Sequence, residues 1–152
     1  MCGIAGSVNY PLNIPQLTHD LFHRGPDEQT TFEEGVVQLH HHRLAILDIA
    51  GGHQPKHHGH FTIIFNGEIY NHNEVRKKMN LNCRGNSDTE TILHAYEKVG
   101  PACLQDEFAE RQVSQLLLPL TLQHADLADL RRALRQVAPM MVERFLPRQR
   151  HA

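Results

Sequence analysis

Short apolar runs rich in Ile, Val and Phe mark the first half of the chain. Gly, Pro or Asn residues bound these runs, which is the usual setting of a β-strand rather than of a long helix. The pattern predicts four strands, at residues 3–9, 36–42, 44–49 and 61–65.

Two later segments have the features of a helix start. In each of them, a residue able to cap a helix is followed three positions later by a glutamate, an arrangement that satisfies free N–H groups of the first turn. These segments begin at Asn71 and Ser87, and the second predicts a helix that ends at Gly100. A further amphipathic helix is predicted at residues 127–137, where Leu and Val recur at helical spacing.

The composition of the chain changes near Gly100. All ten glycines lie at or before that position, while the rest is rich in Leu, Gln, Ala and Arg. With an average glycine usage of about 7%, a glycine-free stretch of this length is unusual. The sequence therefore predicts an α+β unit followed by a helical C-terminal tail of a different character.

The overall composition excludes several classes of protein. The chain has 152 residues with 40% hydrophobic content and a formal net charge of −2, which allows one ordinary globular domain. This charge gives no basic surface for phosphate backbones, so we expect no nucleic-acid partner. No signal-peptide pattern is present and no apolar stretch approaches about 20 residues, so we expect no membrane association. The three cysteines are too few for a disulfide framework, which favours a reducing, cytoplasmic location.

Histidine is unusually frequent, with 13 residues in the chain. Several of them gather at residues 40–42 and 53–60. Adjacent histidines on a connection between strands cannot all converge on one tetrahedral ion. We therefore expect no physiological metal site, and adventitious Zn²⁺ or Ni²⁺ binding is the more frequent explanation of such clusters.

The most specific chemical feature is a cysteine directly after the initiator methionine. If Met1 is removed, Cys2 carries a thiol nucleophile and a free α-amino group with an ordinary pKa near 8. The amine can then serve as the general base, and no separate histidine is needed. The alternative is a structural cysteine that falls at this position by chance, because free cysteines are often buried and inert.

Six motifs follow one another along the chain. They are Met-Cys-Gly-Ile-Ala-Gly (1–6), His-Arg-Gly-Pro-Asp (23–27), His-Arg-Leu-Ala-Ile-Leu-Asp (42–48), Gln-Pro (54–55), Asn-Gly-Glu-Ile-Tyr-Asn (66–71) and Ser-Asp-Thr-Glu (87–90). In this order they resemble the class II glutamine amidotransferases, which are N-terminal nucleophile hydrolases, and specifically their asparagine synthetase branch. The resemblance implies that residues 1–104 form the N-terminal part of such a domain, a partial four-layer αββα sandwich, and leaves residues 105–152 as a tail of unassigned origin.

The same resemblance implies a glutaminase reaction at Cys2. The thiol would attack the side-chain amide carbon of glutamine, release ammonia and form a γ-glutamyl thioester that water hydrolyses to glutamate. The side-chain amide of Asn66 and the backbone N–H of Gly67 would stabilise the oxyanion. Losing one such donor typically costs about 10²–10³ in rate.

The resemblance also implies a binding site for the amino-acid end of glutamine. Arg43 would bind the α-carboxylate, because a guanidinium fork matches two carboxylate oxygens. Asp88 would hold the α-ammonium group, with Glu68 nearby, and Leu44 and Ile46 complete the expected substrate-binding set. Taken alone, Arg43 and Asp88 also fit a solvated charge and an acid in a helix-capping turn.

The sequence leaves two hypotheses of different class open. The first is a glutamine-hydrolysing enzyme. It would act alone, as a homodimer, or as the ammonia-producing half of an enzyme completed by a synthetase partner chain. No ATP-pyrophosphatase loop is recognisable, so we expect no cofactor in this chain, and ATP and Mg²⁺ would belong to a partner. The second is a truncated or frameshifted, inactive product, or an interaction module that acts with a partner chain.

Overall fold

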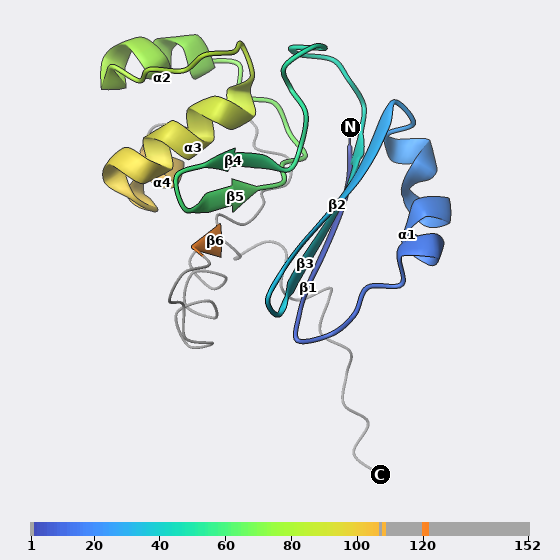
Figure 1. The fold of residues 1–152 in the computed structure, drawn as a ribbon. Coiled ribbons are helices and arrows are strands. Elements are labelled where there is room, and N and C mark those ends of the chain that lie inside the picture. Colours follow the sequence, from blue (N-terminus) through green and yellow to red (C-terminus); the bar gives the residue numbers. More distant parts are fainter. Residues whose placement is uncertain (1, 107, 109–119, 122–152) are drawn as a thin grey trace.

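Strands and helices alternate along the first hundred residues of the protein. The computed structural model describes residues 2–106, 108 and 120–121 (Figure 1). Within them, the elements in chain order are β1 (Gly3–Val8), α1 (Ile14–Leu21), the 3-10 helix η1 (Phe22–Arg24), β2 (Glu28–Glu34), β3 (Val37–Arg43), β4 (Lys56–His58), β5 (Phe61–Ile63), α2 (His72–Met79), α3 (Asp88–Val99), α4 (Ala102–Asp106) and β6 (Leu120–Thr121).

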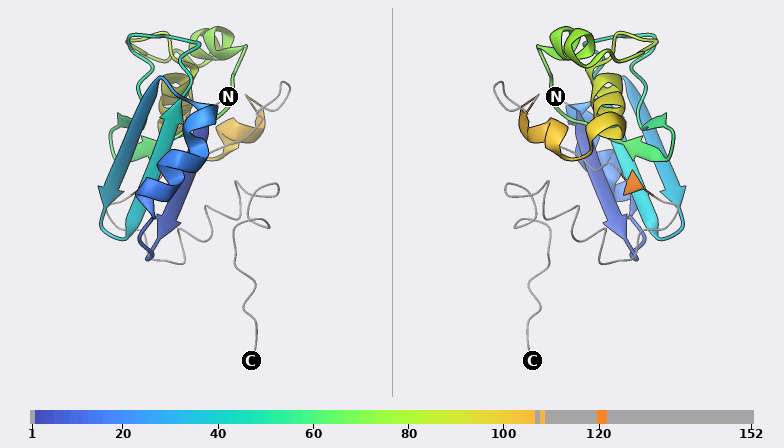
Figure 2. Two further views of the ribbon diagram at one scale, coloured as in Figure 1. Left: turned by 90° about the vertical axis from the view of Figure 1, so that its right-hand side faces the viewer. Right: turned by 90° about the vertical axis from the view of Figure 1, so that its left-hand side faces the viewer.

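The first sheet has the strand order β1–β3–β2 and is antiparallel throughout. Gly3 pairs with His42 of the central strand, and Glu28 of β2 pairs with Arg43 on its other side. This register brings the start of β1 and the end of β3 to the same edge of the molecule. Helix α1 lies against one face of the sheet, beside β1 and β3 (Figure 2).

The second sheet has the order β4–β5–β6 and separates the first sheet from the later helices. Side chains of an extended segment alternate between its two faces. Accordingly, Ile63 and Phe65 belong to an apolar cluster with α2 and α3, whereas Ile64 packs against Val37 and Leu39 of β3. One short segment therefore contributes to both halves of the core.

The predicted helix starts at Asn71 and Ser87 are confirmed, and so is the end of α3 at Gly100, where φ is +69°. The expected side-chain caps at Asn71 and Ser87 are wrong, because neither side chain forms a capping hydrogen bond. The Glu90 carboxylate instead accepts hydrogen bonds from the N–H groups of Arg84 and Gly85, at 2.8 and 2.9 Å, in the loop before the helix. The predicted helix at 127–137 and almost all of the tail lie outside the described residues.

The predicted strand at residues 44–49 is wrong, because the chain forms an irregular loop there. Asp48 has a positive φ of 45°, and the side chains of Ile46 and Ile49 are 62% and 70% exposed. The guanidinium of Arg43 donates hydrogen bonds to carbonyl oxygens of this loop. A buried cation therefore takes up carbonyl groups that a strand would use for its ladder.

Three cysteines are present, and all are free thiols. Cys103 is buried in the apolar cluster around α3, while Cys2 and Cys83 are half-buried. As for membranes, none of the helices in the described part of the chain combines the length and the apolar character that a membrane span requires.

Three consecutive histidines of β3, His40, His41 and His42, are fully buried, and they predict sensitivity to acid. Burial lowers the pKa of His41 to about 4. An imidazole in the unfolded chain has a pKa near 6.5. Between pH 6.5 and pH 4 the unfolded state therefore binds a proton at His41 that the folded state does not bind. We expect the free energy of unfolding to fall by about 2 kcal/mol from His41 alone between pH 7 and pH 5, as measured by urea denaturation.

The variant His41→Asn should lose this part of the pH dependence. The matched variant His23→Asn replaces an exposed ring and should keep it. Contributions of opposite sign from buried carboxyl groups are common to both variants and cancel in the comparison. Parallel stability curves for the two variants would contradict the prediction.

Candidate active site

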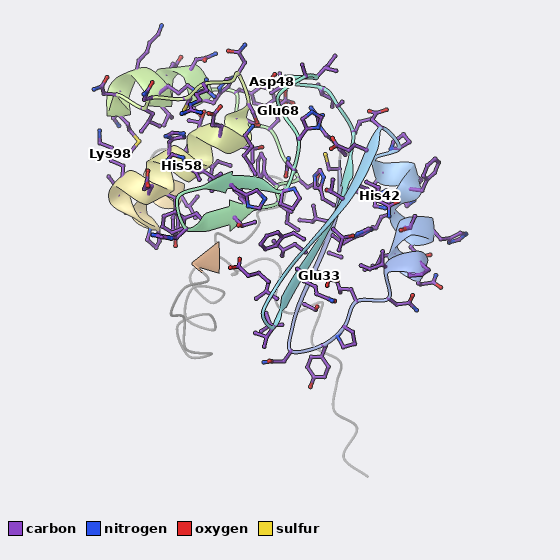
Figure 3. The ribbon with its side chains drawn as sticks, in the orientation of Figure 1. Glu33, His42, Asp48, His58, Glu68 and Lys98 are labelled. Atoms are coloured by element: carbon purple, nitrogen blue, oxygen red, sulfur yellow. The ribbon has the colours of Figure 1, made fainter. Side chains whose placement is uncertain are left out.

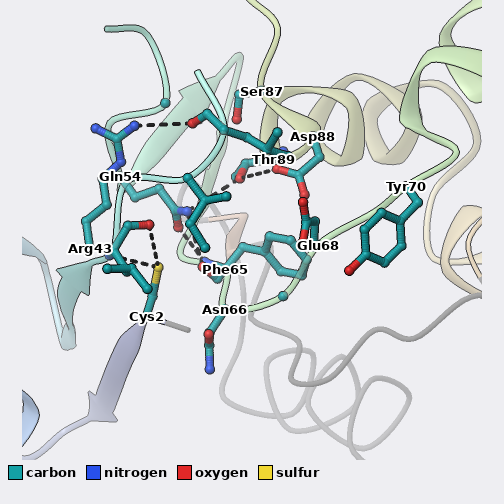
Figure 4. Close-up of a pocket in the computed structure, with 15 residues that line it drawn as sticks. Cys2, Arg43, Gln54, Phe65, Asn66, Glu68, Tyr70, Ser87, Asp88 and Thr89 are labelled. Atoms are coloured by element: carbon teal, nitrogen blue, oxygen red, sulfur yellow. Dashed lines mark hydrogen bonds between the residues drawn. The ribbon is translucent and has the colours of Figure 1, made fainter. Parts of the chain in front are cut away.

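A pocket of about 270 Å³ lies where the loop after β3, the segment after β5 and the start of α3 meet (Figure 4). All of the residues that the sequence predicts as catalytic or substrate-binding line it: Cys2, Arg43, Leu44, Ile46, Asn66, Gly67, Glu68 and Asp88. Seven further residues complete the lining: Leu47, Gly52, Gln54, Phe65, Tyr70, Ser87 and Thr89. The fold thus brings together motifs that are far apart in the sequence.

Cys2 stands directly before β1 and is held at the pocket wall by the backbone of Leu44. The N–H of Leu44 donates to the sulfur at an N···S distance of 3.4 Å, and the thiol lies 3.8 Å from the carbonyl oxygen of the same residue. The pairing of Gly3 with His42 accounts for this position, because it sets the residue before β1 next to the residues that follow β3.

The motif at residues 23–27 supports this corner of the pocket. A Cβ atom on Gly25 would lie 2.3 Å from the carbonyl oxygen of His42, so only glycine fits against the backbone of β3. The Asp27 carboxylate accepts a hydrogen bond from the N–H of Ala45 at 2.8 Å, and Arg24 Nε donates to the carbonyl oxygen of Cys2 at 3.4 Å. The motif therefore holds both the Cys2 segment and the start of the loop opposite it.

Arg43 is buried, with 6% of its side chain exposed, so the alternative of a solvated charge is wrong. Its Nη1 donates to the Glu28 carboxylate and to the carbonyl oxygen of Ile49, each at 3.2 Å. Its Nη2 donates at 2.8 Å to the carbonyl oxygen of Asp48, and more weakly, at 3.5 Å, to that of Leu47. Arg43 therefore shapes the loop after β3 as well as lining the pocket.

Glu28 is a functional neighbour that the sequence analysis missed. Burial alone would raise the pKa of its carboxyl, but hydrogen bonds and charges from His53 and Arg43 lower it. The ionised carboxylate offsets the buried charge of the guanidinium. Its strand is polar and carries no recognisable motif, so the only signal would have been the pairing of Glu28 with Arg43, which exists only in the folded sheet.

Gln54 joins three parts of the pocket wall. Its side-chain oxygen accepts the N–H of Phe65 at 2.5 Å, and its nitrogen donates to the Phe65 carbonyl at 3.2 Å and to the Thr89 hydroxyl at 3.4 Å. The side-chain amide of Gln54 thus forms the hydrogen bonds with the Phe65 backbone that a neighbouring strand would otherwise form. This contact sets the position of Asn66, which is fully buried, and of Gly67, where a Cβ would lie 2.7 Å from the Phe65 ring.

Replacing Gln54 by alanine is expected to lower the free energy of unfolding by about 3 kcal/mol. The reason is that a buried N–H and a buried carbonyl of Phe65 lose their partner, and each unsatisfied group costs about 1–3 kcal/mol. Urea denaturation measures the loss. The matched variant Gln29→Ala removes an exposed hydrogen bond to the Thr18 hydroxyl and should change stability by less than about 0.5 kcal/mol. Equal effects of the two substitutions would refute the role of Gln54.

Asp88 is a buried carboxylate at the start of α3. It accepts hydrogen bonds from the N–H groups of Ile69, at 3.0 Å, and Thr89, at 2.7 Å. Burial raises the pKa of Asp88, against the lowering effect of these two bonds. Within the described part of the chain no Lys or Arg forms a salt bridge with it. A cationic group of a ligand would offset the cost of this burial.

Charged side chains of opposite sign line two sides of the pocket. Cys2 and Arg43 lie on one side of the pocket, and Glu68 and Asp88 lie on the other (Figure 4). The lining residues Ile46 and Tyr70 are exposed, and the Glu68 carboxylate raises the pKa of the Tyr70 hydroxyl through a hydrogen bond and its charge. The arrangement suits a small molecule that carries both an anionic and a cationic group.

Among the described residues, two groups of side chains have the spacing of metal ligands, and neither lines the pocket. One consists of His58, His94 and Glu97, and the other of Cys83, Glu90 and His94. Figure 3 shows His58 beside α3, apart from Glu68 in the pocket. The pocket itself presents a thiol, amides and carboxylates.

Comparison with known proteins agrees with this arrangement. Residues 1–108 match the family model described as a glutamine amidotransferase domain. The chain is 41% identical over 112 residues to glutamine-hydrolyzing asparagine synthetase 3 of Bacillus subtilis, covering 63% of this chain and 18% of that protein. It is 40% identical over 110 residues to glutamine-hydrolyzing asparagine synthetase 1 of Arabidopsis thaliana, covering 66% of this chain and 19% of that protein. For a putative glutamine-hydrolyzing asparagine synthetase 2 of Methanocaldococcus jannaschii, the identity is 33% over 132 residues, with 70% and 26% coverage. The chain thus spans about a fifth to a quarter of the length of these relatives.

Proposed function

Since this chain belongs to the glutamine amidotransferase domain family, we propose that it hydrolyses the side-chain amide of glutamine at the pocket beside Cys2. It is homologous to the glutaminase domain of asparagine synthetases. The observation that carries the proposal is the meeting of the motif residues around one pocket that contains a thiol.

In the proposed mechanism, Cys2 becomes the N-terminal residue after Met1 is removed. Its free α-amine takes the thiol proton, and the sulfur attacks the side-chain amide carbon of glutamine. The Asn66 amide and the Gly67 N–H stabilise the oxyanion of the tetrahedral intermediate. The amine proton passes to the leaving nitrogen, ammonia departs, and water hydrolyses the γ-glutamyl thioester to glutamate with return of the proton to sulfur.

The two charged walls support the proposed orientation of glutamine. Asp88, with Glu68 nearby, binds the α-ammonium group, which supplies a cationic partner to a carboxylate that no described Lys or Arg pairs with. Arg43 binds the α-carboxylate. Its bond to the Leu47 carbonyl is the longest it makes, at 3.5 Å, so the carboxylate replaces that contact at the smallest cost. Leu44 and Ile46, which also line the pocket, complete the proposed substrate-binding set.

The packing order of the described elements supports a proposal for the whole fold. Helix α1 lies on the first sheet, the first sheet contacts the second through Ile64, and the second sheet contacts α3. We propose that these are the layers of the αββα sandwich of N-terminal nucleophile hydrolases. The ammonia would be consumed by a synthetase unit, in a partner chain or a second copy, and ATP and Mg²⁺ would act there.

The proposal is tested by measuring glutamate and ammonia from glutamine, with intact mass used to establish that Met1 is absent. We expect equal amounts of the two products, and no hydrolysis of asparagine, whose shorter side chain places the amide away from the thiol. The matched control is the same chain with a residue left ahead of Cys2, which should be inactive because its amine is blocked. Equal rates for the free and the blocked chain would refute the proposed mechanism.

A further inference from the structure

Three side chains with metal-ligating atoms meet between β4 and α3, outside the pocket. His58 is the last residue of β4, and His94 and Glu97 lie one turn apart on the same face of α3. Their ligand atoms all lie within 4.8 Å of one another. His58 Nε2 is 2.7 Å from Glu97 Oε2, and the imidazole rings of His58 and His94 are stacked with centroids 3.8 Å apart.

We propose that His58, His94 and Glu97 bind a divalent transition-metal ion of the zinc type. Imidazole nitrogen and carboxylate oxygen are ligands that Zn²⁺ prefers, and three protein ligands leave a fourth position for water. The side chains are 31%, 15% and 49% exposed, so an ion can enter from solvent. In a tetrahedral zinc site the ligand atoms are about 3.3 Å apart. His58 Nε2 and Glu97 Oε2, now 2.7 Å apart, must therefore separate and any wider pair within the 4.8 Å limit must close, by rotation of the side chains.

The second group, Cys83, Glu90 and His94, is a weaker candidate because Glu90 is already engaged. Its two carboxylate oxygens accept the N–H groups of Arg84 and Gly85, and an ion there would compete with both bonds. Glu97, by contrast, faces His58 and solvent.

The proposed ion has a structural consequence for the fold. It would join the hairpin of β4 and β5 to α3, the helix that also carries Asp88 at its first position. From the sequence alone we expected no metal site among the histidines of residues 53–60, because adjacent side chains in one loop cannot all converge on one ion. The folded chain instead combines one of them, His58, with two ligands from a helix. We therefore expect the ion to raise the stability of the domain and to leave the chemistry at Cys2 unchanged.

The test is a Zn²⁺ titration of the chain without any affinity tag, in a Cys2→Ala background that removes the pocket thiol. Competition with a chromophoric chelator measures the affinity, and the visible absorption of bound Co²⁺ reports tetrahedral geometry. We expect one ion per chain with a micromolar or tighter dissociation constant and a higher thermal unfolding midpoint. The substitutions His94→Gln and Glu97→Gln should each weaken binding at least tenfold.

Two control variants make the result specific. His60→Gln replaces an exposed histidine close to His58 and should leave the affinity unchanged. Cys83→Ser should also leave it unchanged, because Cys83 belongs to the other group. The proposal is overturned if no ion binds at micromolar concentration, or if Cys83→Ser weakens binding while Glu97→Gln does not. Neither measurement depends on glutamine hydrolysis, so this proposal and the proposed function can fail separately.

Discussion

Replacing Cys2 by alanine is expected to reduce the rate of glutamine hydrolysis at least about 10⁴-fold. The reason is that alanine has no group that can form the γ-glutamyl thioester, and loss of a covalent nucleophile removes the whole two-step pathway. The thiol acts in the chemical step and is not among the groups proposed to hold glutamine, so the effect should appear in kcat rather than in KM. Glutamate release under saturating glutamine, with Met1 absent by intact mass, measures it.

The chain contains a matched control for this prediction. Cys83 is a second half-buried thiol, and burial raises its pKa, but it does not line the pocket. Cys83→Ser should therefore retain activity. Alkylation adds an independent readout, because glutamine should protect Cys2 from iodoacetamide and leave Cys83 unprotected. If Cys2→Ala and Cys83→Ser released glutamate at the same rate, the N-terminal thiol would not be the nucleophile.

The elements that the sequence predicted are those whose signal is local. Strands β1, β3 and β5 contain Ile, Val, Leu or Phe and lie near turn-forming residues, and α3 begins after Ser87 and ends at Gly100. Strand β2 was missed because it reads Glu-Gln-Thr-Thr-Phe-Glu-Glu and has only Phe32 as an apolar member. It forms because β3 pairs with it on one edge, and this pairing is a tertiary property. The loop at 44–49 was predicted as a strand because its residues are apolar. It forms a loop because Arg43 binds its carbonyl groups, and the burial of Arg43 against Glu28 exists only in the folded sheet.

The pocket shows the same division between local and tertiary signals. The predicted site residues lie in short motifs of unusual composition, so their resemblance to a family was readable before the fold was known. Glu28 contacts Arg43, and Gln54 contacts the backbone of Phe65. Both contacts exist only after folding. Sequence reasoning could place Gln54 in a motif, but its hydrogen bonds to Phe65 required the structure.

The substitution Asp88→Asn is expected to raise the KM for glutamine about 10²-fold with a smaller change in kcat. The ionised carboxylate is the proposed partner of the α-ammonium group, and truncating one member of a buried, hydrogen-bonded charge pair costs about 2–5 kcal/mol in binding. Because this interaction is the same in the ground state and the transition state, its loss appears mainly in KM. Steady-state kinetics on the wild type and the variant give the two parameters.

A glutamine analogue without the α-amino group makes this prediction specific. The wild type should prefer glutamine over the analogue, and Asp88→Asn should lose most of this preference. The control Asp20→Asn, a change at an exposed acid, should keep it. The pH dependence has a definite sign. Burial raises the pKa of Asp88, so the KM of the wild type should rise as the pH falls through that pKa and the carboxylate is neutralised. Bound ammonium favours the charged form, so glutamine should shift the titration of Asp88 to lower pH. An unchanged preference in Asp88→Asn would place the ammonium group elsewhere in the pocket, with Glu68 as the next carboxylate to test.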